Sequence, residues 1–404
     1  MADNKENKVL NVPALRFPEF TDEWHKQSLG EIGETIIGLT YKPSDVVESN
    51  GTIVLRSSNI KNGVIDYSDL VRVNKPIKER IITKENDILI CARNGSQRLI
   101  GKNAIIKKED ANNTFGAFMM VYRSKDNPFI LPLLSTKRYF SQVGENLGAR
   151  INQITTSDFN GFDFYFPNSH AERAKIAELF RLIDERIATQ NKIIEKYESL
   201  IQAIIYQKKT DGIRKGNWQK TELSKVLQER TEKNINGYTV CSVSVSQGII
   251  NQIEYLGRSF AAKETSHYNV VKYGDIVYTK SPTGDFPYGI VKRSYIKNAV
   301  AVSPLYGVYK PIDDNIGVIL HFYFMQPNNA FNYLHPLIQK GAKNTINITN
   351  TRFLENSIPL PKTEDEAVYI ANALTRIQTK IDIEKSLLRS YEREKQYLLR
   401  QMFI

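Results

Sequence analysis

The sequence contains one pattern twice, and the two copies are separated by a constant 194 residues. Trp24 corresponds to Trp218, Pro167 to Pro361, and Tyr197 to Tyr391, and in each case the difference in residue number is 194 (218−24, 361−167 and 391−197). One fixed offset near half of a 404-residue chain indicates two copies of a large unit, not a solenoid of many short repeats. Each copy is predicted to be a globular domain followed by one long helix.

Each predicted helix carries a heptad pattern. Residues 170–207 contain no glycine or proline, and their apolar residues recur at alternating steps of four and three, as at the a and d positions of a coiled coil. The first stripe is Ile176, Phe180, Ile183, Ile187, Gln190, Ile194, Tyr197, Ile201 and Ile204. The second, 194 residues later, is Ile370, Leu374, Ile377, Ile381, Glu384, Leu388, Tyr391, Lys395 and Leu398. A single such helix usually packs on its own domain, but two matched stripes predict that the helices pair with each other.

The chain order of these elements predicts the direction of the pairing. A helix over 170–207 would be about 57 Å long at ~1.5 Å per residue and would lead the chain away from the first domain. The second helix starts at the second domain, so pairing makes the two antiparallel and returns 396–404 to the N-terminal segment. Gln190 and Glu384 are equivalent polar positions near the middle. They are expected either to fix the register of the pair or to lie at a solvated helix edge.

The globular parts have the pattern of mixed domains. Short runs rich in β-branched and aromatic residues, separated by glycine and asparagine, predict strands at 52–55, 87–91, 104–107, 118–122 and 162–166, and 131–146 is predicted to be helical. The expected fold is α+β: two mixed α/β domains separated by a pair of long antiparallel coiled-coil helices, with an internal pseudo-two-fold repeat. The expected boundaries are a tail and extended segment at 1–20, a first domain at 21–168, a first helix at 169–209 that ends at Thr210-Asp211-Gly212, a second domain at 210–362 and a second helix at 363–404.

Composition limits the class of protein. A net charge of +11 suggests an anionic partner, nucleic acid foremost, although surplus lysines on an ordinary soluble protein give the same balance. Cys91 and Cys241 stand at non-equivalent positions and predict a reducing cytosol, not a disulfide framework. The polar stretch 1–8 is not the pattern of a signal peptide, and the apolar runs are too short to cross a bilayer. We therefore expect a cytoplasmic protein without a membrane partner.

The motifs of common catalytic classes are absent from the sequence. The five histidines are scattered, and there is no HExxH, CxxC, Walker, GxGxxG or GxSxG motif. Asn127-Pro128-Phe129 lacks the second proline of the amino-methyltransferase motif and is predicted to be a turn. We expect no catalytic, cofactor-binding or metal-binding residues in this chain.

Several predicted loops are rich in side chains that bind base edges and phosphates, namely Arg, Asn, Gln, Ser and Lys. Two of these loops follow matched strands that begin at Asp87 and Asp275. Exposed turns are often rich in the same residues without binding anything, so that alternative stays open. The candidate DNA-binding residues are Arg56, Asn59, Arg93, Asn94, Ser96, Gln97, Arg98, Arg150 and Asn152 in the first copy, and Lys280, Ser281, Thr283, Lys343 and Asn344 in the second.

Four features together carry a resemblance that covers nearly all of residues 13–404. They are the opening segment 12–20, the matched segments 85–90 and 273–278, the segment 154–167, and the long helix after each domain. With these features the chain resembles the specificity subunit of type I restriction-modification systems. The resemblance implies two target-recognition domains that each bind one half of a split site in double-stranded DNA, with the helices as a ruler between them.

The resemblance also implies partners. These are two adenine-methylating modification subunits and, for cleavage, two translocating restriction subunits, which would use S-adenosylmethionine, ATP and Mg²⁺ in place of this chain. Two alternatives remain open at this point. A degenerate or fused DNA adenine methyltransferase would bind S-adenosylmethionine itself, and a purely structural coiled-coil adaptor would show no salt-dependent affinity for DNA.

Overall fold

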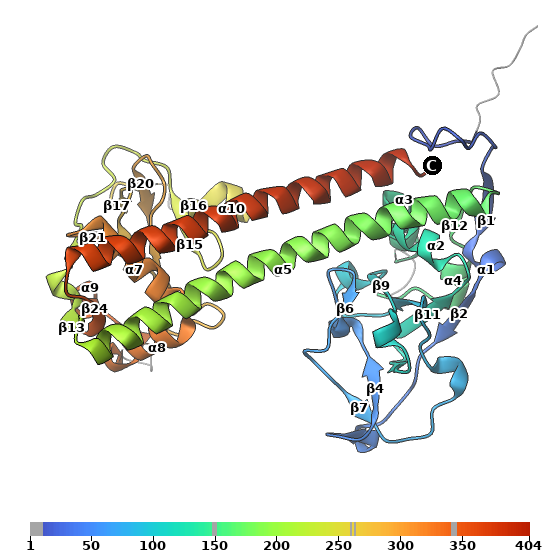
Figure 1. Ribbon diagram of the computed structural model, residues 1–404, viewed down its shortest axis with the longest axis horizontal. Helices are drawn as coiled ribbons and strands as arrows, with labels where there is room; N and C mark the ends of the chain where they lie inside the picture. Colours follow the sequence, from blue (N-terminus) through green and yellow to red (C-terminus); the bar gives the residue numbers. More distant parts are fainter. Residues whose placement is uncertain (1–10, 148–151, 259–260, 262–263, 341–345) are drawn as a thin grey trace, which may run out of the picture. The chain divides into compact units, whose positions relative to one another are not determined.

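The chain divides into two compact units that each contain one α+β domain. The computed structural model describes residues 11–147, 152–258, 261, 264–340 and 346–404. One unit is Met1–Thr189 with Leu387–Ile404, and the other is Gln190–Ser386. Each unit includes one segment of both long helices, α5 (His170–Lys215) and α10 (Glu364–Gln401), which are labelled in Figure 1. Within the described residues, no helix is both long and apolar enough to cross a membrane.

The first domain is built around a four-stranded sheet with the order β2-β11-β8-β9, formed by β2 (Glu34–Ile37), β8 (Ile88–Cys91), β9 (Asn103–Ile105) and β11 (Met119–Arg123). A second sheet has the order β10-β4-β7-β3: β3 (Val46–Val47), β4 (Thr52–Leu55), β7 (Arg72–Val73) and β10 (Thr114–Phe115). Two further pairs are β1 (His25–Ser28) with β12 (Asp163–Phe166), and β5 (Ile60–Lys61) with β6 (Val64–Ile65). The helices are α1 (Leu29–Ile32), α2 (Asn127–Leu133), α3 (Lys137–Leu147) and α4 (Thr156–Asn160).

The strand predicted at 87–91 lies at the centre of this domain. Successive side chains of a strand point to opposite faces, so a strand with core on both faces is apolar throughout. Ile88 and Ile90 of β8 pack into the core that contains Trp24, whereas Leu89 and Cys91 pack into a second core with Phe115. Burial on both faces explains why the run Ile-Leu-Ile-Cys shows no polar alternation.

The second domain repeats the central sheet with the order β14-β21-β18-β19, formed by β14 (Leu227–Glu229), β18 (Ile276–Tyr278), β19 (Val291–Arg293) and β21 (Gly307–Pro311). The remaining strands form pairs: β13 (Trp218–Glu222) with β24 (Ser357–Pro361), β15 (Cys241–Ser244) with β16 (Gly248–Asn251), β17 (Asn269–Val271) with β20 (Val300–Val302), and β22 (Gln339–Lys340) with β23 (Ile346–Asn347). The helices are α6 (Gln252–Leu256), α7 (Asp314–Phe324), α8 (Pro327–Leu334) and α9 (Asn350–Phe353).

The two domains also share strand register at their junctions with the long helices. His25 pairs with Phe166 in the first domain, and Gln219 pairs with Leu360 in the second, so both partners are shifted by 194 residues. The adjacent tryptophans make matched contacts: the indole N–H of Trp24 donates to Glu172 at 3.3 Å, and that of Trp218 donates to Glu366 at 2.9 Å. The predicted duplication is therefore confirmed at the level of single hydrogen bonds.

Two local predictions for the segment 127–146 were wrong. Asn127-Pro128-Phe129 begins α2 and is not a free turn, because a proline in the first helical turn has no N–H to leave unsatisfied. The predicted helix at 131–146 is broken between α2 and α3. Thr136 stands at the break, where its hydroxyl donates to the Leu133 carbonyl at 2.7 Å and accepts from the Tyr139 N–H at 3.3 Å.

The predicted end of the first long helix was also wrong, because α5 continues through Gly212 to Lys215. A side chain at position 212 would collide with the indole of Trp218, since a Cβ built there lies 1.9 Å from Cδ1 of that ring. Glycine thus permits close packing here while the helix continues. Gly216, with φ of 76°, is the residue that reverses the chain, as expected for a glycine just beyond a helix C-terminus.

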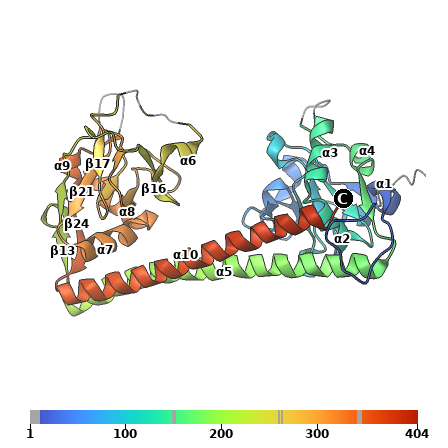
Figure 2. The ribbon, with the colours of Figure 1, turned by 90° about the horizontal axis from the view of Figure 1, so that it is seen from above.

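The long helices pair antiparallel within each unit, as predicted (Figures 1 and 2). In the first unit Asp184 forms an ion pair with Lys395 at 2.5 Å, and the Arg186 guanidinium lies 5.2 Å from the ring centroid of Tyr391. Residue numbers thus rise on α5 as they fall on α10. The same holds in the second unit, where the contacts are Gln190 with Glu384 and Lys208 with Tyr369.

Every predicted pairing residue is buried or half-buried. At the start of α5, however, Ile176 and Phe180 belong to the core of the first domain, so the helix packs on its own domain there. Gln190 is 3% exposed and donates to both the carboxylate and the backbone carbonyl of Glu384. The polar pair is therefore a direct contact between the helices and not a solvated helix edge.

The C-terminal end of α10 returns to the N-terminal segment, as the sequence predicted. The Leu15 N–H donates to the Gln401 carbonyl at 2.8 Å. Phe403 packs edge-on against Trp24 with 6.4 Å between ring centroids, and it joins the core of the first domain. The chain end is thus part of the hydrophobic core of the unit that contains the chain start.

Candidate nucleic-acid interface

The structure brings three of the predicted loop segments of the first domain together. Asn94 donates from its side chain to the Ser57 hydroxyl at 3.0 Å, and its backbone N–H donates to the Asn152 carbonyl at 3.4 Å. Arg93 forms an isolated antiparallel bridge with Gln153. These contacts join 56–59, 92–99 and 152–153; together with Phe118 we name these residues the first loop cluster.

The outward side chains of the first loop cluster carry charge, amide and aromatic groups. Arg93, Ser96, Gln97 and Arg98 are all exposed. The Arg93 guanidinium lies 5.1 Å from the ring centroid of Phe118, which is itself 59% exposed. A planar cation beside an exposed ring is suited to contact with bases and phosphates. Phe118 was missed, because the sequence placed it inside a strand that begins only at Met119.

Other candidates in this cluster have structural roles. Asn59 is fully buried; its amide N–H groups donate to the carbonyls of Asp66 and Asp69 at 2.9 and 2.7 Å, and its oxygen accepts from the Arg56 N–H. The Asn59 side chain is therefore not available to a base edge, contrary to the prediction. Arg56 is half-buried and pairs with Asp69 at 2.7 Å. The Asn94 side chain is likewise used within the cluster.

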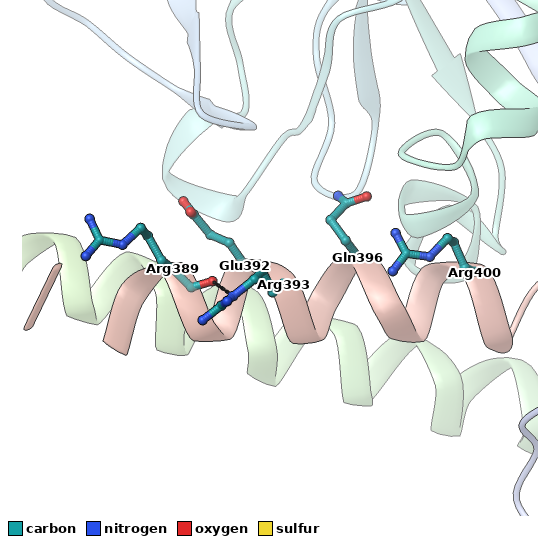
Figure 3. Close-up of a pocket in the computed structure, with 5 residues that line it drawn as sticks. All are labelled: Arg389, Glu392, Arg393, Gln396 and Arg400. Carbon is teal, nitrogen blue, oxygen red and sulfur yellow. Dashed lines mark hydrogen bonds between the residues drawn. The ribbon is translucent and has the colours of Figure 1, made fainter. Parts of the chain in front are cut away.

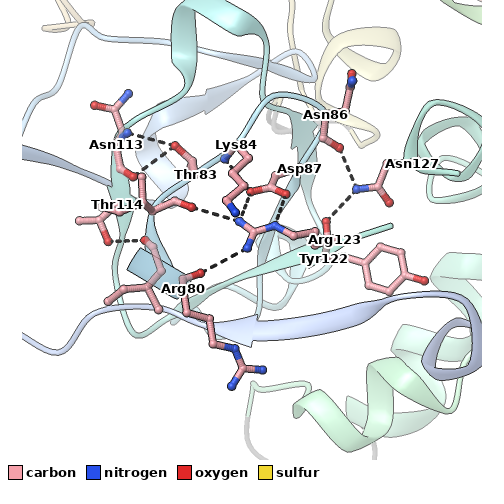
Figure 4. Close-up of polar contacts among 12 residues, drawn as sticks. Arg80, Thr83, Lys84, Asn86, Asp87, Asn113, Thr114, Tyr122, Arg123 and Asn127 are labelled. Atoms are coloured by element: carbon pink, nitrogen blue, oxygen red, sulfur yellow. Dashed lines mark hydrogen bonds and ion pairs between the residues drawn. The ribbon is translucent and has the colours of Figure 1, made fainter. Parts of the chain in front are cut away.

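A buried ion pair fixes the strand that leads into the first loop cluster (Figure 4). Asp87 is 2% exposed and accepts from Nε and Nη2 of Arg123 at 2.8 and 2.6 Å, and from the Lys84 N–H at 2.8 Å. The bond to Asp87 raises the pKa of Arg123, which stays protonated. A bidentate pair of this kind sets direction as well as distance, so it holds the start of β8 in place.

The second domain has the same buried aspartate with a different partner. Asp275 accepts from Nε and Nη2 of Arg230 at 2.6 and 2.9 Å and from the Lys272 N–H at 2.7 Å. Arg230 directly follows β14, whereas Arg123 ends β11. The aspartate before the loop-bearing strand is therefore common to both copies, but its arginine comes from different strands.

The candidate loop of the second domain is a tight turn. The backbones of Thr283 and Phe286 donate to each other at 3.0 Å, and Gly284 between them has φ of 52°. Ser281 and Thr283 are exposed. Lys280 is half-buried, and burial lowers the pKa of its ammonium group. Arg150, Lys343 and Asn344 lie outside the described residues.

The described residues offer little for metal or thiol chemistry. Nowhere in the described ranges do three His, Cys, Asp or Glu side chains gather as metal ligands. Cys91 and Cys241 are buried, and burial raises the pKa of each thiol to about 11. Both thiols are therefore protonated at neutral pH, and neither is an activated nucleophile.

Comparison with known proteins identifies one family. The family described as "Type I restriction modification DNA specificity domain" matches residues 21–199 and 218–393, one domain and most of one long helix each time. The chain is 24% identical to the specificity subunit of the type I restriction enzyme EcoKI from Escherichia coli (strain K12) over 286 aligned residues. The aligned stretch covers 64% of this chain and 61% of that protein. It is 28% identical to the specificity subunit of the type I restriction enzyme StySPI from Salmonella potsdam over 194 aligned residues. That stretch covers 45% of this chain and 42% of that protein.

The matched stretches thus span less than two thirds of either curated relative. One solved structure resembles the chain over most of its length. The S subunit of a type I restriction-modification system from M. genitalium superposes with a TM-score of 0.57 at 13% identity, and the match covers 97% of this chain and 99% of that one. At this identity the likeness concerns the fold.

Proposed function

This chain belongs to the family of type I restriction-modification DNA specificity domains, of which it carries two copies, and we propose that it is the DNA specificity subunit of a type I restriction-modification complex. In this role it selects the DNA sequence and catalyses no reaction itself. The observation that carries the proposal is the family match in both halves of the chain, each with a loop-bearing strand anchored by a buried aspartate.

The proposed target is split and asymmetric. Each domain binds one short half-site, and an unread spacer separates the two half-sites. The half-sites differ because the loops after the matched strands differ: 93–98 contains two arginines, whereas 280–285 contains one lysine and a tight turn. Side chains of different hydrogen-bonding type select different base edges in the major groove.

The chemistry belongs to partner subunits in this proposal. Two modification subunits transfer methyl groups from S-adenosylmethionine to adenine, and two restriction subunits use ATP and Mg²⁺ for translocation and cleavage. The specificity subunit contributes DNA selection and the surface on which these partners assemble.

A map of modified bases tests the proposal. DNA is sequenced from cells that express this chain with its modification partner, and from control cells that express the modification partner alone. We expect methylated adenines in one bipartite motif with two unlike half-sites, and only in the cells that contain both proteins. A continuous motif, a palindromic motif, or the same motif without this chain would contradict the proposal.

A further inference from the structure

The C-terminal part of α10 carries a row of arginines on one face. At about 100° per residue, Arg389, Arg393 and Arg400 fall within about 40° of each other around the helix axis. All three are exposed, and with Glu392 and Gln396 they line a hollow of about 500 Å³. In Figure 3 the side chains of Arg389 and Arg400 project to the same side of the helix. We name Arg389, Arg393 and Arg400 the arginine stripe.

Within the described residues, several cations of the long helices pair with carboxylates, whereas the arginine stripe does not. Arg181 pairs with Glu178 and Glu185, and Lys395 pairs with Asp184 on the opposite helix. Arg393 instead donates to the Arg389 carbonyl and the Ser390 hydroxyl of its own helix, each at 3.3 Å. Within the described residues, none of the three guanidinium groups is neutralised by an ion pair.

The arginine stripe also breaks the internal repeat. Subtracting 194 from 389, 393 and 400 gives Glu195, Ser199 and Tyr206 of α5. The equivalent stretch of α5 has an acidic, a polar and an aromatic residue at these positions, and it belongs to the same antiparallel helix pair. Pairing of the two helices therefore does not require arginines there. Among the described residues that line the hollow, Glu392 is the one acidic side chain, so three positive charges face one negative charge there.

We propose that the arginine stripe binds the phosphate backbone of the target DNA beside the first half-site. This inference rests on the proposed function and adds a contact surface to it. Arg389 and Arg400 are eleven residues apart, which is about 16 Å along the helix axis. Measured along the DNA helix axis, that distance corresponds to about five phosphates of one strand at ~3.4 Å each. Guanidinium groups on a continuous helix face bind such a row without reading bases.

The test measures how duplex affinity depends on salt. The probe is a fluorescently labelled 30-base-pair duplex of arbitrary sequence, and the full chain is titrated by fluorescence anisotropy at several salt concentrations. The variant is R389Q/R393Q/R400Q. We expect its plot of log K against log salt to be shallower by about two to three units, because each lost phosphate contact removes about 0.9 unit of slope.

A charge-matched control separates the arginine stripe from net charge. R80Q/R181Q/R214Q also removes three positive charges, but each of these arginines is exposed and paired with a carboxylate, at 3.3, 2.6 and 2.8 Å. The control should keep the wild-type slope. Equal slopes for the stripe variant and the wild-type chain, equal losses in both variants, or a wild-type chain without salt-dependent duplex binding would each overturn the inference.

The base-modification map distinguishes this inference from the proposed function. A phosphate contact carries no sequence information, so the stripe variant should methylate the same bipartite motif as the wild-type chain, at lower efficiency. If the stripe variant keeps the wild-type slope while the bipartite motif is present, the arginine stripe faces something other than DNA and the proposed function stands. If no bipartite motif exists, the proposed function fails whatever the slopes show.

Discussion

At the scale of single residues, the two copies keep some contacts and replace others. Trp24 and Trp218 each donate to an equivalent glutamate, and Asp87 and Asp275 each accept a bidentate pair from an arginine. The outward residues of the loops show no such agreement. Contacts that hold a loop-bearing strand are thus shared, whereas side chains that face solvent differ, as two domains for two half-sites would require.

The buried pair of Asp87 and Arg123 should contribute strongly to stability. Asp87→Ala leaves the arginine and the Lys84 N–H without their acceptor, so we expect a loss of about 3 kcal/mol in unfolding free energy. Glu34→Ala is the control, because its ion pair with Arg80 is exposed and should contribute less than about 1 kcal/mol. Urea unfolding followed by circular dichroism measures both. Equal midpoints for the two variants would show that the buried pair is dispensable.

Arg93 should affect recognition of the first half-site only. A bidentate contact between arginine and guanine carries about 1–3 kcal/mol of discrimination, so Arg93→Ala should relax base preference at one position there. Lys280→Ala and Thr283→Ala should act only on the second half-site, and Arg80→Ala, outside the first loop cluster, should leave both unchanged. The base-modification map of each variant is the measurement. An Arg93→Ala protein with an unaltered first half-site would remove Arg93 from the interface.

At the scale of elements, one glycine decides how the first long helix joins the second domain. Gly212 lies inside α5, yet the helix packs closely against Trp218, which is buried. The helical propensity of glycine is poor, and the usual expectation is a helix end. Tertiary packing overrides that local preference, because any larger residue would push the indole away.

A pair of glycine variants tests this explanation. Gly212→Ala places a methyl group against the Trp218 ring and should destabilise the second unit by about 1–3 kcal/mol. Gly144→Ala, inside α3 with nothing within 4 Å of the new methyl group, should stabilise the first unit by about 1 kcal/mol. Thermal unfolding of both variants gives the comparison. A stabilising Gly212→Ala would mean that the close contact with Trp218 is readily relieved.

At the scale of the whole molecule, we propose that helix length sets the length of the DNA spacer. Inserting four residues near Gln190 lengthens α5 by about 6 Å. That is about two base-pair steps at ~3.4 Å, reduced where the insertion locally unwinds the helix pair or the partner helix slips.

We therefore expect a spacer longer by about one or two base pairs, with both half-sites unchanged because the loops are untouched. Base-modification maps of otherwise identical cells with and without the insertion make the comparison. If an active insertion variant retains the original spacer, helix length does not set spacer length, and the helices only connect the two domains.

Much of the architecture follows from the sequence by itself. The 194-residue offset indicates the duplication, and apolar runs indicate strands such as β4 and β8. The matched heptad stripes predict that the long helices pair, and the order of domains and helices along the chain makes that pair antiparallel. Repeats, heptads and strand runs are properties of neighbouring or regularly spaced residues, so they are visible without coordinates. The resemblance to type I specificity subunits rests on the same features.

Only the tertiary structure decided which candidate side chains are available to a partner. Asn59 and Asn94 have the composition of DNA-binding residues, but their amides are used by loops that the fold brings together from distant positions. Phe118 became part of the first loop cluster by its place beside Arg93, and Gly212 stayed helical because of Trp218. Each outcome depends on contacts between separate segments, and such contacts form only when the chain has folded.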